Sequence, residues 1–390
     1  MTICFFSAQY LPTVGGVERY TYNLARRVTE AGHRAIVVTS ALPGLPEQEV
    51  TDEGITVYRL PALLLMNGRF PMPKPGGVFH RQAAELWKNH IDFCLIQTRF
   101  YPLSLYAAHA ARRRGIPAIV VDHSTGHMPM GTGPVAWAAH LYEHMACRYL
   151  RGRGVSFYGV SQAVCRWLEH FGVRPAGTLY NAVDPEELRR TALAPDARRW
   201  REELGVGEGG TLTVFAGRLI PEKGIGELIE AFSQLDEPGA VLAVAGDGPM
   251  MEQLNSRVPA GVRLLGALPW ADTQQLIAQA DLYCLPTRYA EGFPTTFLEA
   301  AACGCPILTS VTGGSGELLP DESYGIQLEA PDTAHLLPAL QKALSPAARS
   351  WREEAARKTA LRLEAHFTWE AVTRHLLEIA QNAQGDTQHE

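Results

Sequence analysis

The stretch "TLTVFAGRLIPEKGIGELIEAF" (residues 211–232) shows the pattern that decides the fold. It begins with a short apolar run typical of a buried strand, passes through a loop with Pro and Gly, and ends in a helical pattern. The apolar residues of that last part are Ile225, Leu228, Ile229 and Phe232. A strand that leads through a short loop into a helix is the repeating unit of parallel α/β sheets. This stretch therefore predicts a parallel sheet with helical crossovers.

The same unit recurs along the whole chain. In the first half the apolar runs are "TICFFS", "RAIVVTS", "ITVYRLP", "DFCLIQT", "PAIVVDHS" and "SFYGVS", and in the second half they are "LTVFAG", "AVLAVAG", "VRLLG", "DLYCLP", "PILTS" and "YGIQLE". A chain of 390 residues exceeds the size at which one core keeps growing. We expect an α/β protein of two Rossmann-like, doubly wound parallel-sheet domains that face each other across a cleft at the carboxyl ends of their strands.

Turn residues mark the junction between the two domains. The stretch "TLYNAVDPE" (178–186) supplies Asn, Asp and Pro between the two series of strands. We expect a first domain at 1–180, a second at 181–366, and a C-terminal helical segment at 367–390 that packs back on the first domain.

Composition narrows the class of protein. The chain has 46% hydrophobic residues and a net charge of −6. The charge is unevenly distributed: residues 1–183 contain 18 basic and 11 acidic residues, and residues 184–390 contain 17 basic and 30 acidic residues. A basic first half suits an anionic membrane surface or a phosphate-bearing partner, although a solvated surface also explains it. The seven cysteines form no CxxC pair, which favours reduced thiols. The sequence shows no apolar run of membrane-spanning length and no secretory signal at its start, so we expect a cytoplasmic protein. We expect no nucleic-acid partner.

Several candidate site residues follow the strands directly. Arg218 and Lys223 share one short loop, where the planar fork of Arg and the point charge of Lys can bracket a diphosphate, although each alone is more often a surface charge. Gly15 and Gly16 open the first helix after the first strand and let a phosphate approach the helix amides. They do not form a GxGxxG dinucleotide motif.

Two acids lie eight residues apart in "AEGFPTTFLEAAACGCP" (290–306). The second, Glu299, also fits a capping box with Thr296, in which the two side chains satisfy free amides at a helix start. The capping box leaves Glu291 unexplained. A carboxylate can accept hydrogen bonds from two neighbouring hydroxyls, as a sugar ring or a ribose offers them. The spacing therefore suits a nucleoside diphosphate sugar laid across the helix start formed by Gly292, Phe293, Pro294, Thr295 and Thr296.

His123, in "VVDHSTGH" at the end of a strand, is a further candidate, and Asp122 and His127 beside it are weaker ones. A single histidine is more often a structural residue than a functional one. The sequence contains no Asp-x-Asp and no HExxH, so it gives no indication of a tightly bound catalytic metal.

These motifs together resemble the retaining glycosyltransferases of family 4, which have the GT-B fold. The resemblance covers the chain through "PTVGGVE", "VDHSTGH", "SQAV", "YNAVDP", "GRLIPEKG", "AGDGP", "EGFPTTFLEA" and "TGGSGE", in this order. It implies transfer of a sugar from a nucleoside diphosphate sugar to a hydroxyl of a glycan, lipid-linked or small-molecule acceptor, with retention of configuration and without a metal or a permanently bound cofactor.

The resemblance also implies roles for individual residues. Arg218 and Lys223 would hold the diphosphate, Glu291 would bind sugar hydroxyls, and Glu299 would bind the ribose. Gly16 would line the phosphate and acceptor region, and His123 would lie at the reacting sugar. The chain departs from the family where Ala182 replaces a common glycine, which puts a positive φ at that position in doubt.

Two alternatives remain open from the sequence, a GT-B sugar-nucleotide epimerase and a non-catalytic sugar-nucleotide-binding protein. Residues 61–77 and 133–154 are apolar with basic edges. They fit either an acceptor face for a lipid-linked substrate, with peripheral contact to an anionic membrane at its inner face, or core packing and a loop over the cleft.

Overall fold

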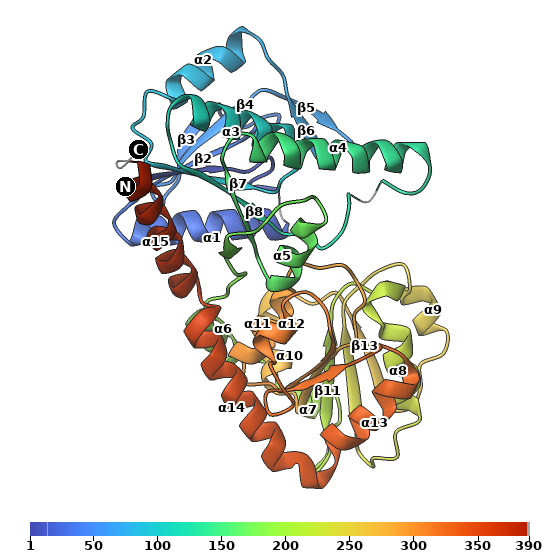
Figure 1. The fold of residues 1–390 in the computed structure, drawn as a ribbon. Helices are drawn as coiled ribbons and strands as arrows, with labels where there is room; N and C mark the ends of the chain where they lie inside the picture. Colours follow the sequence, from blue (N-terminus) through green and yellow to red (C-terminus); the bar gives the residue numbers. More distant parts are fainter. Residues whose placement is uncertain (14, 129, 388–390) are drawn as a thin grey trace. The chain divides into compact units, whose positions relative to one another are not determined.

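The computed structural model describes residues 1–13, 15–128 and 130–387. The chain forms two compact units, one of Met1–Asn181 with the segment from Trp369 onward, and one of Ala182–Thr368 (Figure 1).

The boundaries expected from the sequence differ from this division by one residue at the junction and by two residues before the C-terminal segment. The last three residues of the expected segment 367–390 lie outside the described part of the chain.

The first unit is built on an eight-stranded sheet with the order β10-β9-β8-β7-β1-β2-β4-β3. All neighbours pair in parallel except β3 and β4. Its strands are β1 (Thr2–Phe6), β2 (Arg34–Ser40), β3 (Gln48–Val50), β4 (Thr56–Leu60), β7 (Phe93–Gln97), β8 (Ala118–Asp122), β9 (Ser156–Gly159) and β10 (Gly177–Thr178), and β5 (Ala62–Leu65) and β6 (Phe70–Pro73) form a separate antiparallel hairpin. Its helices are α1 (Gly16–Glu30), α2 (Gly77–Leu86), α3 (Pro102–Arg113), α4 (Pro134–Arg151), α5 (Gln162–Glu169) and α15 (Trp369–Thr387).

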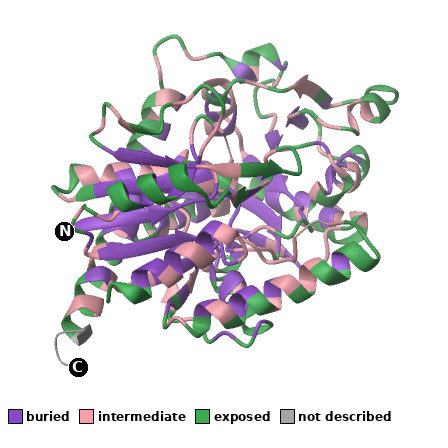
Figure 2. Cartoon of the chain, turned by 90° about the horizontal axis from the view of Figure 1, so that it is seen from above, coloured by how far each residue is buried: buried purple, intermediate pink, exposed green. Residues whose placement is uncertain are grey.

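The central strands of this sheet are buried along their whole length, because helices cover the sheet (Figure 2). Each fully buried aliphatic or aromatic side chain contributes about 1.5–3 kcal/mol. Helix α15 packs along α1 in this unit (Figure 1). The ring of Trp369 lies 5.5 Å from that of Tyr20 on α1, whose hydroxyl donates to the carbonyl of Leu179 at 3.0 Å. The helix buries Leu376 completely. The C-terminal helix therefore completes the core of the first unit.

The second unit is built on a six-stranded parallel sheet with the order β13-β12-β11-β14-β15-β16. Its strands are β11 (Leu212–Ala216), β12 (Val241–Ala245), β13 (Val262–Gly266), β14 (Leu282–Leu285), β15 (Ile307–Ser310) and β16 (Ile326–Leu328). Its helices are α6 (Pro185–Ala192), α7 (Trp200–Glu203), the 3-10 turn η1 (Pro221–Lys223), α8 (Ile225–Ser233), α9 (Met251–Asn255), α10 (Trp270–Ala278), α11 (Thr295–Ala302), α12 (Ser315–Leu318), α13 (Thr333–Leu344), the 3-10 turn η2 (Pro346–Ala348) and α14 (Arg349–His366).

The structure confirms the α/β fold with two parallel sheets, and every strand proposed from an apolar run is present. The strands β3, β5, β6 and β10 were not expected, and all of them are only two to four residues long. Positive φ among the described non-glycine residues occurs at Met66, Asn67 and Thr98. Ala182 therefore has an ordinary backbone conformation, and replacing glycine there causes no strain.

The capping-box interpretation of Glu299 is wrong. Helix α11 begins at Thr295, so Thr296 lies inside the helix, and no side chain caps the start. Glu299 instead accepts a hydrogen bond of 3.0 Å from the side-chain amide of Gln274 on α10. The carboxylate thus connects two helices and leaves the amides at the start of α11 available to another acceptor.

Within the described residues, no helix has the length and hydrophobicity needed to cross a membrane. All seven cysteines are free thiols, and all but Cys303 are buried.

Candidate functional site

The candidate site residues lie where the order of the strands reverses. In the first sheet the chain proceeds outward from β1 in one direction and from β7 in the other, and in the second sheet β11 and β14 play these parts. At such a switch point the loops after the two central strands diverge and leave a crevice. Residues 7–9 and 98–101 border it in the first unit, and residues 217–224 and 286–294 border it in the second.

In the second unit, the structure brings Lys223 and Glu291 into direct contact. Lys223 ends the turn η1 after β11, and Glu291 lies in the loop after β14. The two side chains are 12% and 22% exposed, so the pair retains access to solvent and can be reached by a ligand. The loops are also joined by Arg288, which pairs with Glu227 and whose amide donates to the carbonyl of Glu222 at 2.8 Å. These bonds fix the two loops that carry Lys223 and Glu291 to each other.

Two glycines allow the chain to pack closely around this pair. Gly224 has a φ of 72°, and a Cβ there would lie 2.1 Å from the carbonyl oxygen of Pro286. A Cβ on Gly314 would lie 2.4 Å from the ring of Phe293, which is also packed at 5.3 Å against Phe367. The side chain of Phe293 is thus part of the core, and only its backbone can face a ligand.

The start of α11 lies directly after Glu291. Gly292 and Pro294 are buried, Thr295 is exposed and Thr296 is partly exposed. The uncapped amides of this eight-residue helix form a positive end that favours an anionic group. Arg218, at the end of β11, is exposed, and its guanidinium has no ion-pair partner among the described residues.

In the first unit, a cavity of about 210 Å³ lies at the switch point. It is lined by residues from the loop after β1, from α1 and from the ends of β7 and β8, including Gln9, Glu18, Gln97, Thr98 and His123. Thr98 has a φ of 64°, which is rare for a β-branched residue. Such strain costs on the order of 1–3 kcal/mol and occurs mainly at functional sites.

His123 faces this cavity as a neutral side chain. Its Nε2 donates to Oε1 of Gln97 at 2.7 Å, and the ring of Tyr20 meets it edge-on at 4.9 Å. Burial lowers the pKa of His123 to about 4, although the neighbouring Asp122 acts in the opposite direction. Neutral His123 can give or take a hydrogen bond at neutral pH, but it does not supply a positive charge.

Gly15 and Gly16 lie at the start of α1, as expected, but a carboxylate occupies the same place. A Cβ on Gly15 would lie 2.3 Å from an oxygen of Glu18, whose side chain turns back over the start of the helix. Burial raises the pKa of Glu18. A phosphate at this helix start would therefore meet Glu18, which the sequence reasoning had not considered.

The loop that holds His123 is fixed by a buried ion network. Arg99 pairs with Asp122 at 2.9 Å and with Glu143 on α4 at 2.6 Å, and all three side chains are fully buried. Glu143 also accepts a hydrogen bond of 2.9 Å from the amide of Met128, and Arg99 Nη2 donates to the carbonyl of Gly126 at 3.4 Å. The network thus connects both ends of the loop after β8. Asp122, a weaker candidate in the sequence, is one of its structural members.

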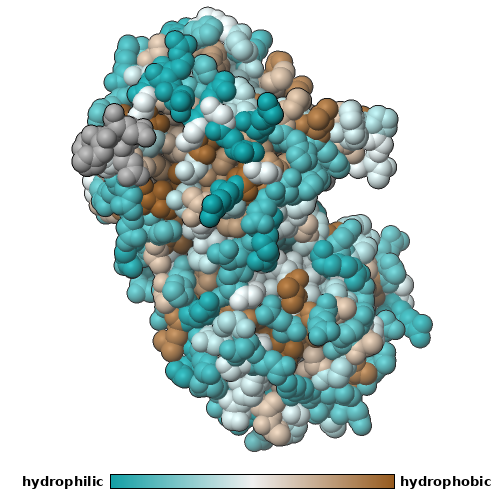
Figure 3. Space-filling view, viewed as in Figure 1, coloured by the Kyte–Doolittle hydropathy of each residue, from teal (hydrophilic) through white to brown (hydrophobic). Residues whose placement is uncertain are grey.

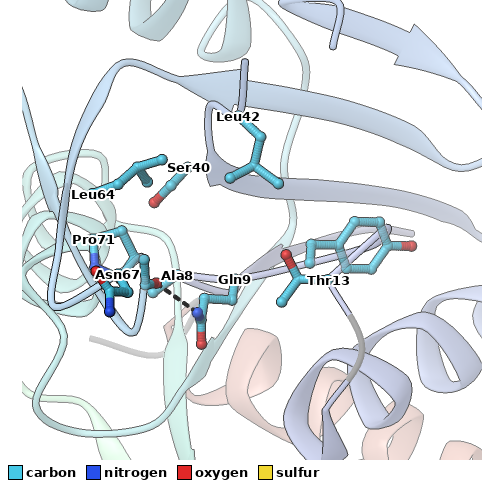
Figure 4. A pocket seen from close by; sticks show the side chains of 10 residues that line it. Ala8, Gln9, Thr13, Ser40, Leu42, Leu64, Asn67 and Pro71 are labelled. Carbon is cyan, nitrogen blue, oxygen red and sulfur yellow. Dashed lines mark hydrogen bonds between the residues drawn. The ribbon is translucent and has the colours of Figure 1, made fainter. Parts of the chain in front are cut away.

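A second cavity of about 370 Å³ adjoins the first, because Ala8 and Gln9 line both. Figure 4 shows Leu64 and Pro71 of the β5–β6 hairpin on one side of it and Thr13 on the other. Gln9 donates to the carbonyl of Gly68 at 2.7 Å and so connects the hairpin to the loop after β1.

The described residues contain no group of three or more His, Cys, Asp or Glu side chains arranged to hold a metal ion. Of the sequence-predicted site residues, Gly15, Gly16 and His123 lie in the first unit, as do the weaker candidates Asp122 and His127, and the others lie in the second.

Two parallel sheets with polar residues at their switch points are typical of nucleotide-binding α/β proteins, and comparison with known proteins identifies the class. The family model "Glycosyl transferases group 1" matches residues 196–359, and the model "Glycosyltransferase Family 4" matches residues 14–187. The chain belongs to the group 1 glycosyltransferases, which have the GT-B fold and use nucleotide sugars.

Individual relatives are consistent with this class. Glycogen synthase of Mycobacterium tuberculosis is 35% identical over 403 residues, which cover 95% of this chain and 92% of the relative. A GDP-mannose-dependent monoacylated alpha-(1-6)-phosphatidylinositol monomannoside mannosyltransferase of Corynebacterium glutamicum is 26% identical over 386 residues, which cover 95% of each chain. The structure of Anabaena HepE in complex with UDP superposes with a TM-score of 0.74 at 19% identity, over 98% of this chain and 100% of that one.

Sequence reasoning missed Glu18, Gln97 and Thr98 as residues of the first cavity. Gln97 and Thr98 are polar residues at the carboxyl end of an apolar run, and Glu18 is an acid in the first turn of a helix that follows a strand. Each residue is polar and lies next to the end of a strand or the start of a helix, but many loop residues without a function share these two features.

The low pKa of His123 predicts how stability depends on pH. The unfolded chain takes up a proton near pH 6.5, whereas the folded protein resists it down to about pH 4. Stability contributed by neutral His123 is therefore present above pH 6.5 and is lost as the pH falls toward 4.

Between pH 7 and 4.5, the variant His123→Gln should lose about 2 kcal/mol less unfolding free energy than the wild type in urea titrations. The exposed control His90→Gln should lose as much as the wild type, and equal losses in all three proteins would contradict the assignment.

The Arg99 network predicts a large effect of one neutral substitution. Glu143→Gln removes one of two carboxylates from a fully buried arginine and should lower the unfolding free energy by about 3 kcal/mol. Glu169→Gln, on the exposed surface of α5, should change it by less than about 0.5 kcal/mol. Equal effects of the two changes in urea titrations would show that the buried network does not stabilise the loop.

Proposed function

We propose that this protein is a retaining, metal-independent glycosyltransferase whose second unit binds a nucleoside diphosphate sugar. The observation that carries the proposal is the contact of Lys223 with Glu291 directly before the uncapped start of α11. One cation, one carboxylate and one positive helix end are thereby gathered at the switch point of a parallel sheet.

Each part of this arrangement matches one part of the donor. The helix start and Lys223 can hold the diphosphate, with Arg218 as a second cation. Glu291 can accept hydrogen bonds from two hydroxyls of the sugar, and Glu299, one turn further along α11, can do so for the ribose. In this proposal Lys223 exchanges its contact with Glu291 for the diphosphate when the donor binds.

In the proposed reaction the acceptor hydroxyl attacks the anomeric carbon from the face that the diphosphate leaves. The bond from this carbon to the acceptor oxygen forms as its bond to the phosphate oxygen breaks, and the proton of the hydroxyl passes to the departing diphosphate. Positive charge at the diphosphate stabilises the leaving group. Lys223, Arg218 and the amides of α11 supply that charge, so we propose that the reaction requires no metal.

We propose that the first unit binds the acceptor, a hydroxyl of a glycan or lipid-linked molecule, and that neutral His123 hydrogen-bonds the reacting sugar. The cavity beside His123 and the second cavity under the β5–β6 hairpin support this proposal. The basic first half of the chain supports a cytoplasmic protein that works at the inner face of a membrane.

Thermal melting with nucleotides tests the donor site. One of UDP, GDP, ADP, dTDP and CDP, at about a hundred times its Kd, should stabilise the protein by about 2.7 kcal/mol, with and without EDTA. Lys223→Ala should abolish this shift, whereas Lys342→Ala, which removes an exposed lysine paired with Glu322, should leave it unchanged. If none of the nucleotides changes the melting temperature, the donor site is not where we propose it.

Transfer kinetics test the carboxylate. Glu291→Gln should lower kcat/KM by about 30-fold or more, because an amide offers one neutral acceptor oxygen where a carboxylate offers two charged ones. The exposed control Glu322→Gln should have wild-type kinetics, and both variants should melt within about 2 °C of the wild type. A collapse in the melting temperature of Glu291→Gln would make the residue structural. Turnover of the sugar nucleotide without an acceptor would favour an epimerase.

A further inference from the structure

The first unit exposes hydrophobic side chains on two neighbouring elements. The exposed hydrophobic residues of the β5–β6 hairpin include Leu63, Leu65 and Met72, and those of α4 include Trp137 at 68%, Leu141 at 45% and Met145 at 54%. We call these six residues the apolar face. Soluble proteins rarely expose hydrophobic residues in contiguous groups unless the surface binds a partner.

The hairpin residues lie on one side of the hairpin. Leu63 pairs with Met72, and Leu65 pairs with Phe70. Paired residues of an antiparallel ladder lie on the same side, so these four side chains share one side. The ring of Phe70 contacts Tyr101 at 5.7 Å and Tyr142 of α4 at 6.2 Å. The exposed leucines and Met72 therefore lie on the side of the hairpin that meets α4.

The helical residues continue this surface. Trp137, Leu141 and Met145 recur every fourth residue and so form one stripe along α4. Tyr142, which contacts the hairpin, lies on the flank between this stripe and the buried side of the helix. Figure 3 shows hydrophobic atoms at the surface over the hairpin and over the adjoining part of α4. The two groups of side chains thus form one apolar face.

Basic residues continue the stripe at the end of α4. Arg148 follows Met145 on the same side of the helix, and Arg151 and Arg153 follow it. The end of α3 adds further arginines nearby, because Arg112 lies 2.9 Å from the position of a Cβ on Gly154. Residues 54–84, which include the hairpin, contain no Asp or Glu.

Acids are almost absent from this part of the surface. Residues 100–180 contain eight arginines and three acids, and two of these acids, Asp122 and Glu143, are buried against Arg99. Glu169 is the one acid of that stretch on the surface. Each basic residue near an anionic bilayer contributes about 1 kcal/mol to binding, and an apolar stripe beside them inserts into the interface.

We infer that the apolar face and the adjoining arginines dock onto an anionic lipid bilayer. A second copy of this chain would bring the same arginines into contact and be repelled, and a polyanion such as nucleic acid would leave the apolar face exposed.

Leu64 and Pro71 point to the opposite side of the hairpin and line the cavity of Figure 4. Docking brings this cavity to the level of the lipid headgroups, and given the proposed function, this selects an acceptor hydroxyl borne by a lipid.

Vesicle co-sedimentation tests the docking. At about 50 mM salt the protein should bind phosphatidylcholine vesicles that contain about one third phosphatidylglycerol, and binding should fall at about 500 mM salt. Trp137→Ala with Leu141→Ala should weaken binding about tenfold or more. The control, Trp270→Ala with Leu361→Ala, removes an exposed pair of the same residue types from the second unit and should leave binding unchanged.

A second pair of variants tests the charge. Arg148→Glu with Arg151→Glu should abolish binding to the anionic vesicles, whereas Arg199→Glu with Arg349→Glu, at exposed positions of the second unit, should retain most of it. Equal loss from both pairs would overturn the inference, as would equal binding to vesicles without phosphatidylglycerol. A doubled native mass that Trp137→Ala restores to the monomer, without vesicle binding, would make the face a self-association surface.

Nucleotide melting separates the docking from the proposed function. All four double variants should keep the wild-type stabilisation by nucleotide, because none of these residues is among those assigned to the donor site. Vesicle binding without any stabilisation by nucleotide in the wild type would leave the docking intact and refute the donor site. Stabilisation by nucleotide without vesicle binding would support the donor site and refute the docking.

Discussion

Burial of a parallel sheet on both faces is the constraint on which this structure depends. The central strands of both sheets are completely buried, so almost all of their side chains are apolar. Polar residues concentrate where the strands end, and parallel pairing places all carboxyl ends on one edge. His123 follows β8, Arg218 follows β11, and Glu291 follows β14 for this reason.

Two ion pairs of this protein show how burial separates structure from function. Arg99 and its two carboxylates are fully buried, so no ligand can displace one partner, and breaking the network leaves an uncompensated charge. Lys223 and Glu291 retain access to solvent. Such a pair can exchange its partners for those of a ligand more readily than a fully buried pair can.

Much of the fold could be predicted from the sequence, because strands buried on both faces are short apolar runs that helical patterns separate. The β5–β6 hairpin could not, because its strands are four residues long and include Pro71 and Pro73, which argue against a strand. The capping box failed because a sequence pattern does not fix the first residue of a helix, and the helix begins two residues earlier than the box requires. The residues of the second-unit site could be predicted because each follows an apolar run. Nothing in the sequence indicates that the side chain of Glu18 turns back over Gly15.

The placement of α15 has a consequence for synthesis on the ribosome. The sheet of the first unit is complete in the chain by Thr178, but the helix that covers α1 and buries Tyr20 against Trp369 is made only after the whole second unit. A nascent chain thus carries an incomplete core through the translation of almost two hundred residues. During that interval the exposed side of α1 is a natural binding surface for chaperones, and the second unit, whose residues are contiguous, can finish folding before the first.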